Sequence, residues 1–67
     1  MLVFNLWQSQ NNAQWYFNIK ARNGEKVAQS EGYVSRQGAA HAIDLIRTYA
    51  GQATVNEYHS GRWVTVA

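Results

Sequence analysis

Residues 15–51, WYFNIKARNGEKVAQSEGYVSRQGAAHAIDLIRTYAG, decide the fold of this chain. The stretch opens with alternating apolar and polar residues, reaches an Asn-Gly turn signal and continues as a second extended run, which predicts two paired strands. After Ser35 the apolar residues recur at helical spacing, and Ala39, Ile43 and Ile46 share one stripe. The segments before and after this stretch have the residue pattern of further strands, which we expect to join the same unit.

The expected fold class is α+β, with an antiparallel sheet of three to five strands packed on one face by a single helix. A chain of 67 residues allows one domain, residues 1–67. A domain of this size buries only about 60% of the surface that its unfolded chain exposes. The chain has no Cys, which excludes disulfides and thiolate metal sites. Self-association is the remaining common way to stabilise so small a domain.

The charge of the chain is nearly balanced. Six Lys and Arg face four Asp and Glu, for a formal net charge of +2. This small excess permits nucleic-acid binding without indicating it. The N-terminus has no basic segment of a secretory signal, and no apolar run approaches the roughly 20 residues that span a bilayer. We expect a cytoplasmic protein with no membrane partner.

The first two expected strands are residues 2–8 and 14–21, joined by the polar turn SQNNA. If Asn11 and Asn12 form a two-residue turn, Leu6 lies opposite Phe17 and the apolar faces of both strands coincide. That agreement supports the register.

The second turn, Arg22-Asn23-Gly24, has two alternatives. A tight Asn-Gly loop would put Val27 on the wrong face of the sheet. A type I turn with Gly24 as a left-handed bulge residue puts Val27 opposite Ile19, in the core. We prefer the bulged turn, and the third strand is then residues 26–30.

The connection to the helix contains Glu31 and Gly32, and we expect the carboxylate of Glu31 to fix this corner by a hydrogen bond. Ser35 is the expected N-cap, because its hydroxyl can accept a hydrogen bond from the first turn. The helix should cover residues 36–50, with Gly51 as its C′ stop.

The expected core combines both strands and the apolar stripe of the helix. It consists of Leu2, Phe4, Leu6, Phe17, Ile19, Val27, Tyr33, Ala39, Ile43 and Ile46. The tail, residues 54–67, alternates in the manner of strand, and Ser60-Gly61 suits either a hairpin turn or a bend in one extended segment. The tail could pair with the open edge of the first strand or with a partner chain.

Three short motifs in residues 15–50 resemble the YegP-like family of small bacterial proteins. They are KARNG at 20–24, SEGY at 30–33, and the small-residue-rich helix start from Ser35 that leads to HAIDLI at 41–46. The resemblance implies a unit of two or three strands and a helix, which some members carry twice in tandem.

A single-unit chain resembles half of such a pair, so the resemblance implies a homodimer with exchanged or shared strands. The family has no established biochemical activity, and no catalytic residues can be transferred from it. Residues 61–67 extend beyond the usual single unit.

Few residues suit catalysis. His41 and Asp44 are three apart on the expected helix, but no third ligand or nucleophile accompanies them. His59 is typical of the end of a strand, and the capping role of Ser35 explains that hydroxyl. We therefore expect no enzyme, no cofactor and no metal.

The sheet face away from the helix is more informative. In the register above, Trp7 lies opposite Tyr16 and Asn5 opposite Asn18, a mixture that suits either a protein interface or a nucleic-acid platform. Lys20, Arg22 and Lys26 gather near the second turn, and apolar tail residues need burial. The candidate binding residues are Trp7, Tyr16, Asn18, Lys20, Arg22, Lys26, Tyr58 and Trp63.

These observations favour a small non-enzymatic interaction module that acts as a homodimer, through its sheet face or an exchanged C-terminal strand. The alternative is a nucleic-acid-binding protein that uses the outer sheet face and the basic turn. A small-molecule site in a dimer groove is a third reading.

Overall fold

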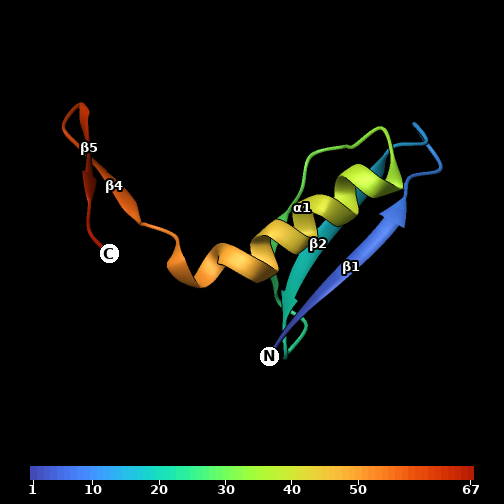
Figure 1. The fold of residues 1–67 in the computed structure, drawn as a ribbon, viewed down its shortest axis with the longest axis horizontal. Helices are drawn as coiled ribbons and strands as arrows, with labels where there is room; N and C mark the ends of the chain where they lie inside the picture. Colours follow the sequence, from blue (N-terminus) through green and yellow to red (C-terminus); the bar gives the residue numbers. More distant parts are fainter.

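The computed structural model describes all 67 residues as an α+β fold (Figure 1). A three-stranded antiparallel sheet in the order β1-β2-β3 is followed by a helix, a short 3-10 turn and a separate two-stranded hairpin. The elements are β1 (Leu2–Gln8), β2 (Trp15–Ala21), β3 (Lys26–Gln29), α1 (Arg36–Tyr49), η1 (Ala50–Gln52), β4 (Asn56–His59) and β5 (Arg62–Thr65).

The register of β1 and β2 is the predicted one. Leu6 lies opposite Phe17, and Phe4 opposite Ile19. The connecting loop is longer than the two-residue turn considered from the sequence. The Ser9 N–H donates to Gln14 O at 2.8 Å, and the Ala13 N–H donates to Ser9 O at 2.9 Å. Both the predicted turn and the observed longer loop are centred between Asn11 and Asn12, so the register of the two strands is the same.

The turn between β2 and β3 is also the predicted bulged turn, but Val27 is not in the core. Gly24 has a φ of +89°, and its N–H donates to Ala21 O at 2.9 Å. Lys26 then pairs with Lys20, whereas Ala28, not Val27, pairs with Ile19. A second bulge therefore inserts Val27 as an extra residue, and this side chain is 58% exposed.

The helix begins as predicted and ends differently. Ser35 Oγ accepts a hydrogen bond from the Gly38 N–H at 3.0 Å, which confirms the N-cap. Helix α1 ends at Tyr49 and continues as the 3-10 turn η1. The predicted stop at Gly51 is wrong in its geometry, because Gly51 lies inside η1 and has no positive φ.

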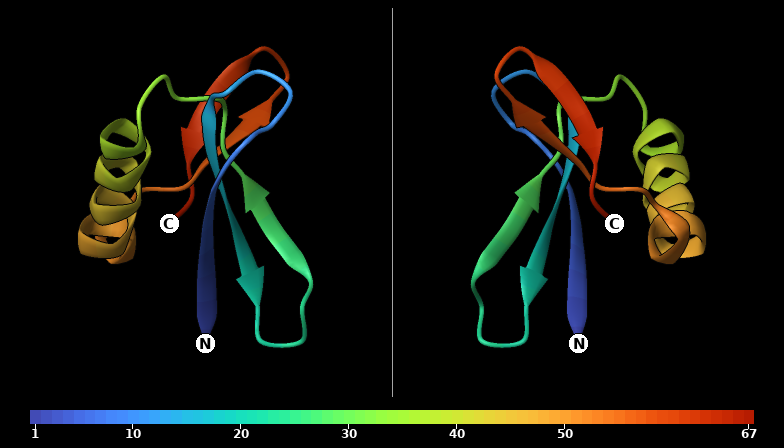
Figure 2. Two further views of the ribbon diagram at one scale, coloured as in Figure 1. Left: turned by 90° about the vertical axis from the view of Figure 1, so that its right-hand side faces the viewer. Right: turned by 90° about the vertical axis from the view of Figure 1, so that its left-hand side faces the viewer.

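The core lies between the inner face of the sheet and α1 (Figure 2). Phe17, Ile19 and Ala39 are buried, and Ala39 has no exposed surface. The partly buried residues packed on them are Phe4, Leu6, Trp15, Tyr33, Ala42, Ile43 and Ile46. Two predicted core residues are therefore wrong: Val27 is displaced by the bulge, and Leu2, at the first position of β1, is 58% exposed.

The corner between β3 and α1 is held by Ser30 and Tyr33. Ser30 Oγ accepts a hydrogen bond from the Phe17 N–H and donates one to Glu31 O, both at 2.9 Å. Tyr33 forms an isolated bridge with Trp15 through two backbone hydrogen bonds. The expected side-chain role of Glu31 is wrong, because only its carbonyl takes part in this network.

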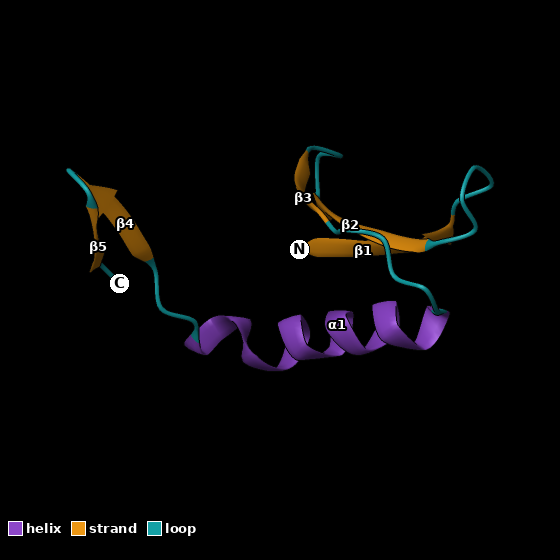
Figure 3. Ribbon diagram, turned by 90° about the horizontal axis from the view of Figure 1, so that it is seen from above, coloured by secondary structure: helices purple, strands orange, loops and turns teal.

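The tail forms the β4–β5 hairpin, which is one of the two predicted alternatives. Ser60 and Gly61 have φ values of +47° and +89°, which suits a two-residue type I′ turn. The hairpin is a sheet of its own and stands away from the body beyond the end of α1 (Figure 3). No helix is long and apolar enough to cross a membrane.

Candidate functional site

The outer face of the three-stranded sheet has no element packed against it (Figure 3). Because opposite residues in antiparallel strands share a face, the observed registers sort its side chains into three rows across the strands. An aromatic row, an amide row and a lysine row follow one another along the strands. They are Trp7 and Tyr16; Asn5, Asn18 and Gln29; and Val3, Lys20 and Lys26.

Trp7 and Tyr16 form a stacked pair, with ring centroids 6.0 Å apart and an interplanar angle of 21°. The Tyr16 hydroxyl accepts a hydrogen bond from Asn12 Nδ2 at 2.8 Å, which links the ring to the preceding loop. Trp7 is 37% exposed. The pair is therefore an aromatic surface whose position is fixed by stacking and by a hydrogen bond and which remains accessible to solvent.

The amide row and the lysine row make this face polar and cationic. Asn5 Nδ2 donates a hydrogen bond to Asn18 Oδ1 at 3.0 Å. Lys20 and Lys26 lie directly opposite each other, and neither forms an ion pair. None of the three rows contains an acidic residue, so the two ammonium groups face solvent without a neutralising partner on the face.

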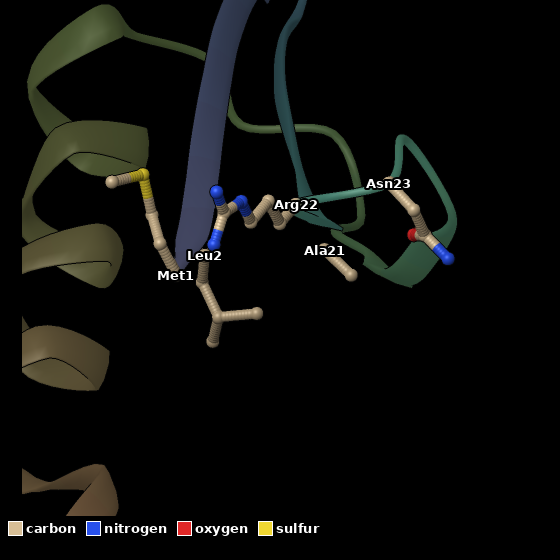
Figure 4. Close-up of a pocket in the computed structure, with 5 residues that line it drawn as sticks. All are labelled: Met1, Leu2, Ala21, Arg22 and Asn23. Atoms are coloured by element: carbon tan, nitrogen blue, oxygen red, sulfur yellow. The ribbon is translucent and has the colours of Figure 1, made fainter.

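Arg22 lies apart from these rows. It lines a shallow hollow together with Met1, Leu2, Ala21 and Asn23, where its side chain reaches toward the start of β1 (Figure 4). Leu2 and Ala21 are opposite each other in the sheet, so the hollow lies where β1 begins and β2 ends, beside the second turn. Arg22 thus lines this hollow, whereas Lys20 and Lys26, which the sequence grouped with it, form the lysine row.

Tyr58 and Trp63 are brought together on the C-terminal hairpin, away from the other candidate residues. Their rings form an edge-to-face pair with centroids 5.3 Å apart and an angle of 65°. Trp63 is 69% exposed and Tyr58 is 58% exposed. The eight candidate residues therefore fall on three surfaces: the outer face, the hollow at Arg22, and the hairpin.

The histidines lie far from these rows. His41 and Asp44 are exposed on α1, while His59 Nε2 lies 3.2 Å from Glu57 Oε2 on the hairpin. No three His, Cys, Asp or Glu residues come together in a metal-binding arrangement.

Residues 10–57 match the family model described as a domain of unknown function, DUF1508. The chain belongs to this family. The resemblance to YegP-like proteins is confirmed, because the proteins similar to this chain include a UPF0339 protein named YegP from Yersinia pestis, 37% identical over 46 residues. That alignment covers 69% of this chain and 41% of the relative.

Other similar UPF0339 proteins are closer to this chain in length. A UPF0339 protein from Agrobacterium fabrum is 40% identical over 57 residues, which covers 84% of this chain and 90% of the relative. One from Neisseria meningitidis serogroup B is 39% identical over 44 residues, covering 66% and 79%. No solved structure matches the chain. The family model ends at residue 57 and thus before β5.

Sequence reasoning missed two features of this DUF1508 domain. Gln29 completes the amide row because it pairs with Asn18, whereas the predicted register placed it opposite Phe17. The second bulge that causes this shift has no Gly or Pro to mark it in the sequence. The hollow was also missed, since it forms only where the turn at Arg22 meets the start of β1.

Proposed function

We propose that this DUF1508 chain is a non-enzymatic interaction module that acts as a homodimer, in which the C-terminal hairpin of each protomer adds to the sheet of the other. The observation that carries the proposal is the isolation of the β4–β5 hairpin. The hairpin packs on no other element. Several of its large apolar side chains therefore stay more than half exposed, and they are Val55, Tyr58, Trp63 and Val66. An isolated two-stranded hairpin is at best marginally stable in water, so a partner surface would stabilise it.

The open edge of β1 is a suitable acceptor. Strand β1 has seven residues, LVFNLWQ, with no charge and no Pro, and it pairs only with β2. The other edge, β3, has four residues and is interrupted by a bulge beside Lys26. Charges and bulges protect a sheet edge from pairing, whereas a long uncharged edge favours the addition of another strand. This contrast favours β1.

The backbone of β1 is oriented for such pairing. Trp15, Phe17 and Ala21 direct backbone groups toward the β3 side, where they bond Tyr33, Ser30 and Glu25. In an antiparallel ladder, pairs of opposite residues alternate along the strands. The two residues of one pair bond to each other, and the two residues of the next pair direct their N–H and C=O groups away from each other. The residues opposite them in β1 therefore direct their N–H and C=O groups to the open edge. They are Gln8, Leu6 and Leu2.

The hairpin suits this edge. The Val66 N–H donates to Val55 O, so this pair is bonded inside the hairpin. Because bonded and unbonded pairs alternate along the ladder, the opposite residues Tyr58 and Trp63 form an unbonded pair and direct their backbone N–H and C=O groups outward. If these outward groups bonded to β1 in antiparallel orientation, the side chains of Tyr58 and Trp63 would lie on the same sheet face as Leu2 and Leu6. That face is covered by α1, which contacts β1 and β2 but not β3. The Tyr58–Trp63 pair would thereby be buried.

Two further points support a dimer. The hairpin with its linker, residues 53–67, and β1 together supply roughly twenty residues per protomer, close to the 20–30 of a standard stable interface. The matched segment spans 41% of the Yersinia pestis YegP, which therefore has room for two such units in one chain. A single-unit chain would need a second copy for the same arrangement.

Sedimentation analysis of two matched double variants tests the proposal. The full chain at micromolar concentration is expected to be a dimer. Replacing Tyr58 and Trp63 with Ala should give a monomer, while the matched variant of the other exposed aromatic pair, Trp7→Ala with Tyr16→Ala, should remain a dimer. A monomer at every concentration would overturn the proposal. If only the Trp7 and Tyr16 variant dissociates, the sheet face is the interface and the hairpin is not.

A second candidate function is nucleic-acid binding at the outer face. The specific observation in its favour is the direct opposition of Lys20 and Lys26 without any acidic residue on that face. Like charges opposite each other are destabilising in a sheet, and a bound phosphate would relieve the repulsion. Titration of a labelled duplex and a labelled single strand at about 50 mM salt, where phosphate contacts are strong, tests it. Failure of both to bind would remove this candidate.

A further inference from the structure

The three rows of the outer face differ in chemistry and follow one another in a fixed order. The aromatic row lies near the β1–β2 loop, the amide row lies in the middle, and the lysine row lies near the β2–β3 turn. Successive rows are two residues apart along the strands, which corresponds to about 7 Å. The outer face therefore has an aromatic surface at one end, two cations at the other end, and hydrogen-bonding amides between them.

We infer that the outer face binds a single-stranded nucleic acid rather than a duplex, with a base stacked at Trp7 and Tyr16 and a phosphate held at Lys20 and Lys26. The inference rests on the second candidate function and specifies its ligand. It requires that the face stays free when α1 covers the opposite one, which is the arrangement in the fold (Figure 2).

The aromatic pair selects against a duplex. Stacking needs the flat face of a base, and in a duplex that face is covered by the neighbouring base pairs. Trp7 and Tyr16 lie within 21° of parallel, and the hydrogen bond from Asn12 links Tyr16 to the loop. Such a preformed aromatic surface accepts any base, because every base has a π face.

The amide row offers both hydrogen-bond donors and acceptors. Asn5 uses Nδ2 and Asn18 uses Oδ1 in their mutual bond, which leaves Asn5 Oδ1 and Asn18 Nδ2 without a side-chain partner. Gln29 adds a third amide in the same row. The edges of unpaired bases present complementary groups, whereas most of these groups are already bonded inside a duplex. The row therefore also favours a single strand.

The lysine row supplies the charge complementarity. Lys20 and Lys26 come from adjacent strands, form no ion pair and share the face with no carboxylate. Two cations can hold about one or two phosphates, which corresponds to a binding site of a few nucleotides. The small net charge of +2 is compatible with so short a footprint.

Fluorescence anisotropy with the full chain tests the inference. The probes are a labelled oligothymidylate of about twelve nucleotides and the duplex of the same length, at about 50 mM salt. The single strand should bind at least tenfold more tightly than the duplex. Equal or tighter binding of the duplex would overturn the single-strand inference and leave the nucleic-acid candidate standing. If neither probe binds, both are overturned.

Matched variants locate the site. Trp7→Ala should weaken single-strand binding by roughly tenfold, because it removes the ring on which a base stacks, and Trp7→Phe should restore most of the affinity. Tyr49→Ala, which removes an exposed aromatic on α1, should leave the affinity unchanged. Circular dichroism checks that each variant is folded. Unchanged binding by folded Trp7→Ala would exclude the aromatic row as the platform.

The salt dependence tests the lysine row separately. Replacing Lys20 and Lys26 with Gln should make the slope of log affinity against log salt shallower by about 0.7 for each lost phosphate contact. Replacing Arg36 and Arg47, which are exposed on α1, should not change the slope. An unchanged slope in the Lys variant would place the phosphate contacts elsewhere and overturn this part of the inference.

Discussion

Ile19 lies opposite Ala28 in the β2–β3 ladder, and this pairing puts Val27 outside the core. The turn at Gly24 alone would have placed Val27 opposite Ile19. The additional bulge shifts the remainder of β3 by one residue, and every side chain after it changes face. Gln29 is thereby moved from the helix side to the outer face, where it completes the amide row.

This pairing predicts unequal costs for two conservative changes. Ile19→Val should lower the free energy of unfolding by about 1 kcal/mol, because it removes a buried methylene. Val27→Ala should change it by less than about 0.5 kcal/mol, because the side chain is exposed. Urea denaturation measures both. A larger loss for Val27→Ala than for Ile19→Val would contradict the observed register.

The two glycines at the ends of predicted elements should respond in opposite ways. Gly24→Ala should destabilise the chain by about 1–2 kcal/mol, because φ is +89° and a side chain there is strained. Gly51→Ala should be neutral or stabilise by up to about 1 kcal/mol, because Gly51 has no positive φ and Ala restricts the unfolded chain. Thermal unfolding followed by circular dichroism distinguishes them. Equal destabilisation by both substitutions would mean that Gly51 has a left-handed backbone conformation.

The N-cap should contribute measurably to stability. Ser35→Ala removes the acceptor of the Gly38 N–H and should cost about 1 kcal/mol. Thr48→Ala is a suitable control, since Thr48 is exposed within α1 and Ala is the better helix former. The control should therefore be as stable as the parent chain or slightly more stable. If Ser35→Ala matched the control, the cap would carry no net stability.

Thermal stability should depend on protein concentration if the hairpin is exchanged between protomers. A dimer that dissociates on unfolding has a melting temperature that rises with concentration. The parent chain should show this rise, and the variant with Tyr58→Ala and Trp63→Ala should lose it. Differential scanning calorimetry over a hundredfold concentration range provides the measurement. A melting temperature that is constant for the parent chain would argue against the exchange.

Much of the fold could be predicted from local signals. The alternation in residues 2–8 and 15–21 set the β1–β2 register, because only one register brings both apolar faces to the same side. The Asn-Gly turn and the cap at Ser35 were recognisable because each depends on a few neighbouring residues. The pairs Trp7–Tyr16 and Asn5–Asn18 followed directly from that register.

What lay beyond these signals needed contacts between distant residues. The bulge at Val27, the 3-10 end of α1 and the position of Arg22 at the hollow carry no local mark in the sequence. The sequence therefore placed Trp7, Tyr16 and Asn18 on one face, but it did not place Arg22 at a hollow or Tyr58 and Trp63 on a separate hairpin.

By itself the sequence determined where β1, β2 and the turn at Gly24 lie in this DUF1508 chain, where α1 begins, and which side chains of β1 and β2 share a face. Periodicity and turn chemistry are local properties, and they are sufficient for that. Only the tertiary structure decided that β3 shifts by one residue, that Leu2 and Val27 stay exposed, and that the hairpin stands free of the body. These outcomes depend on packing between segments, since one helix can cover only one face of a small sheet.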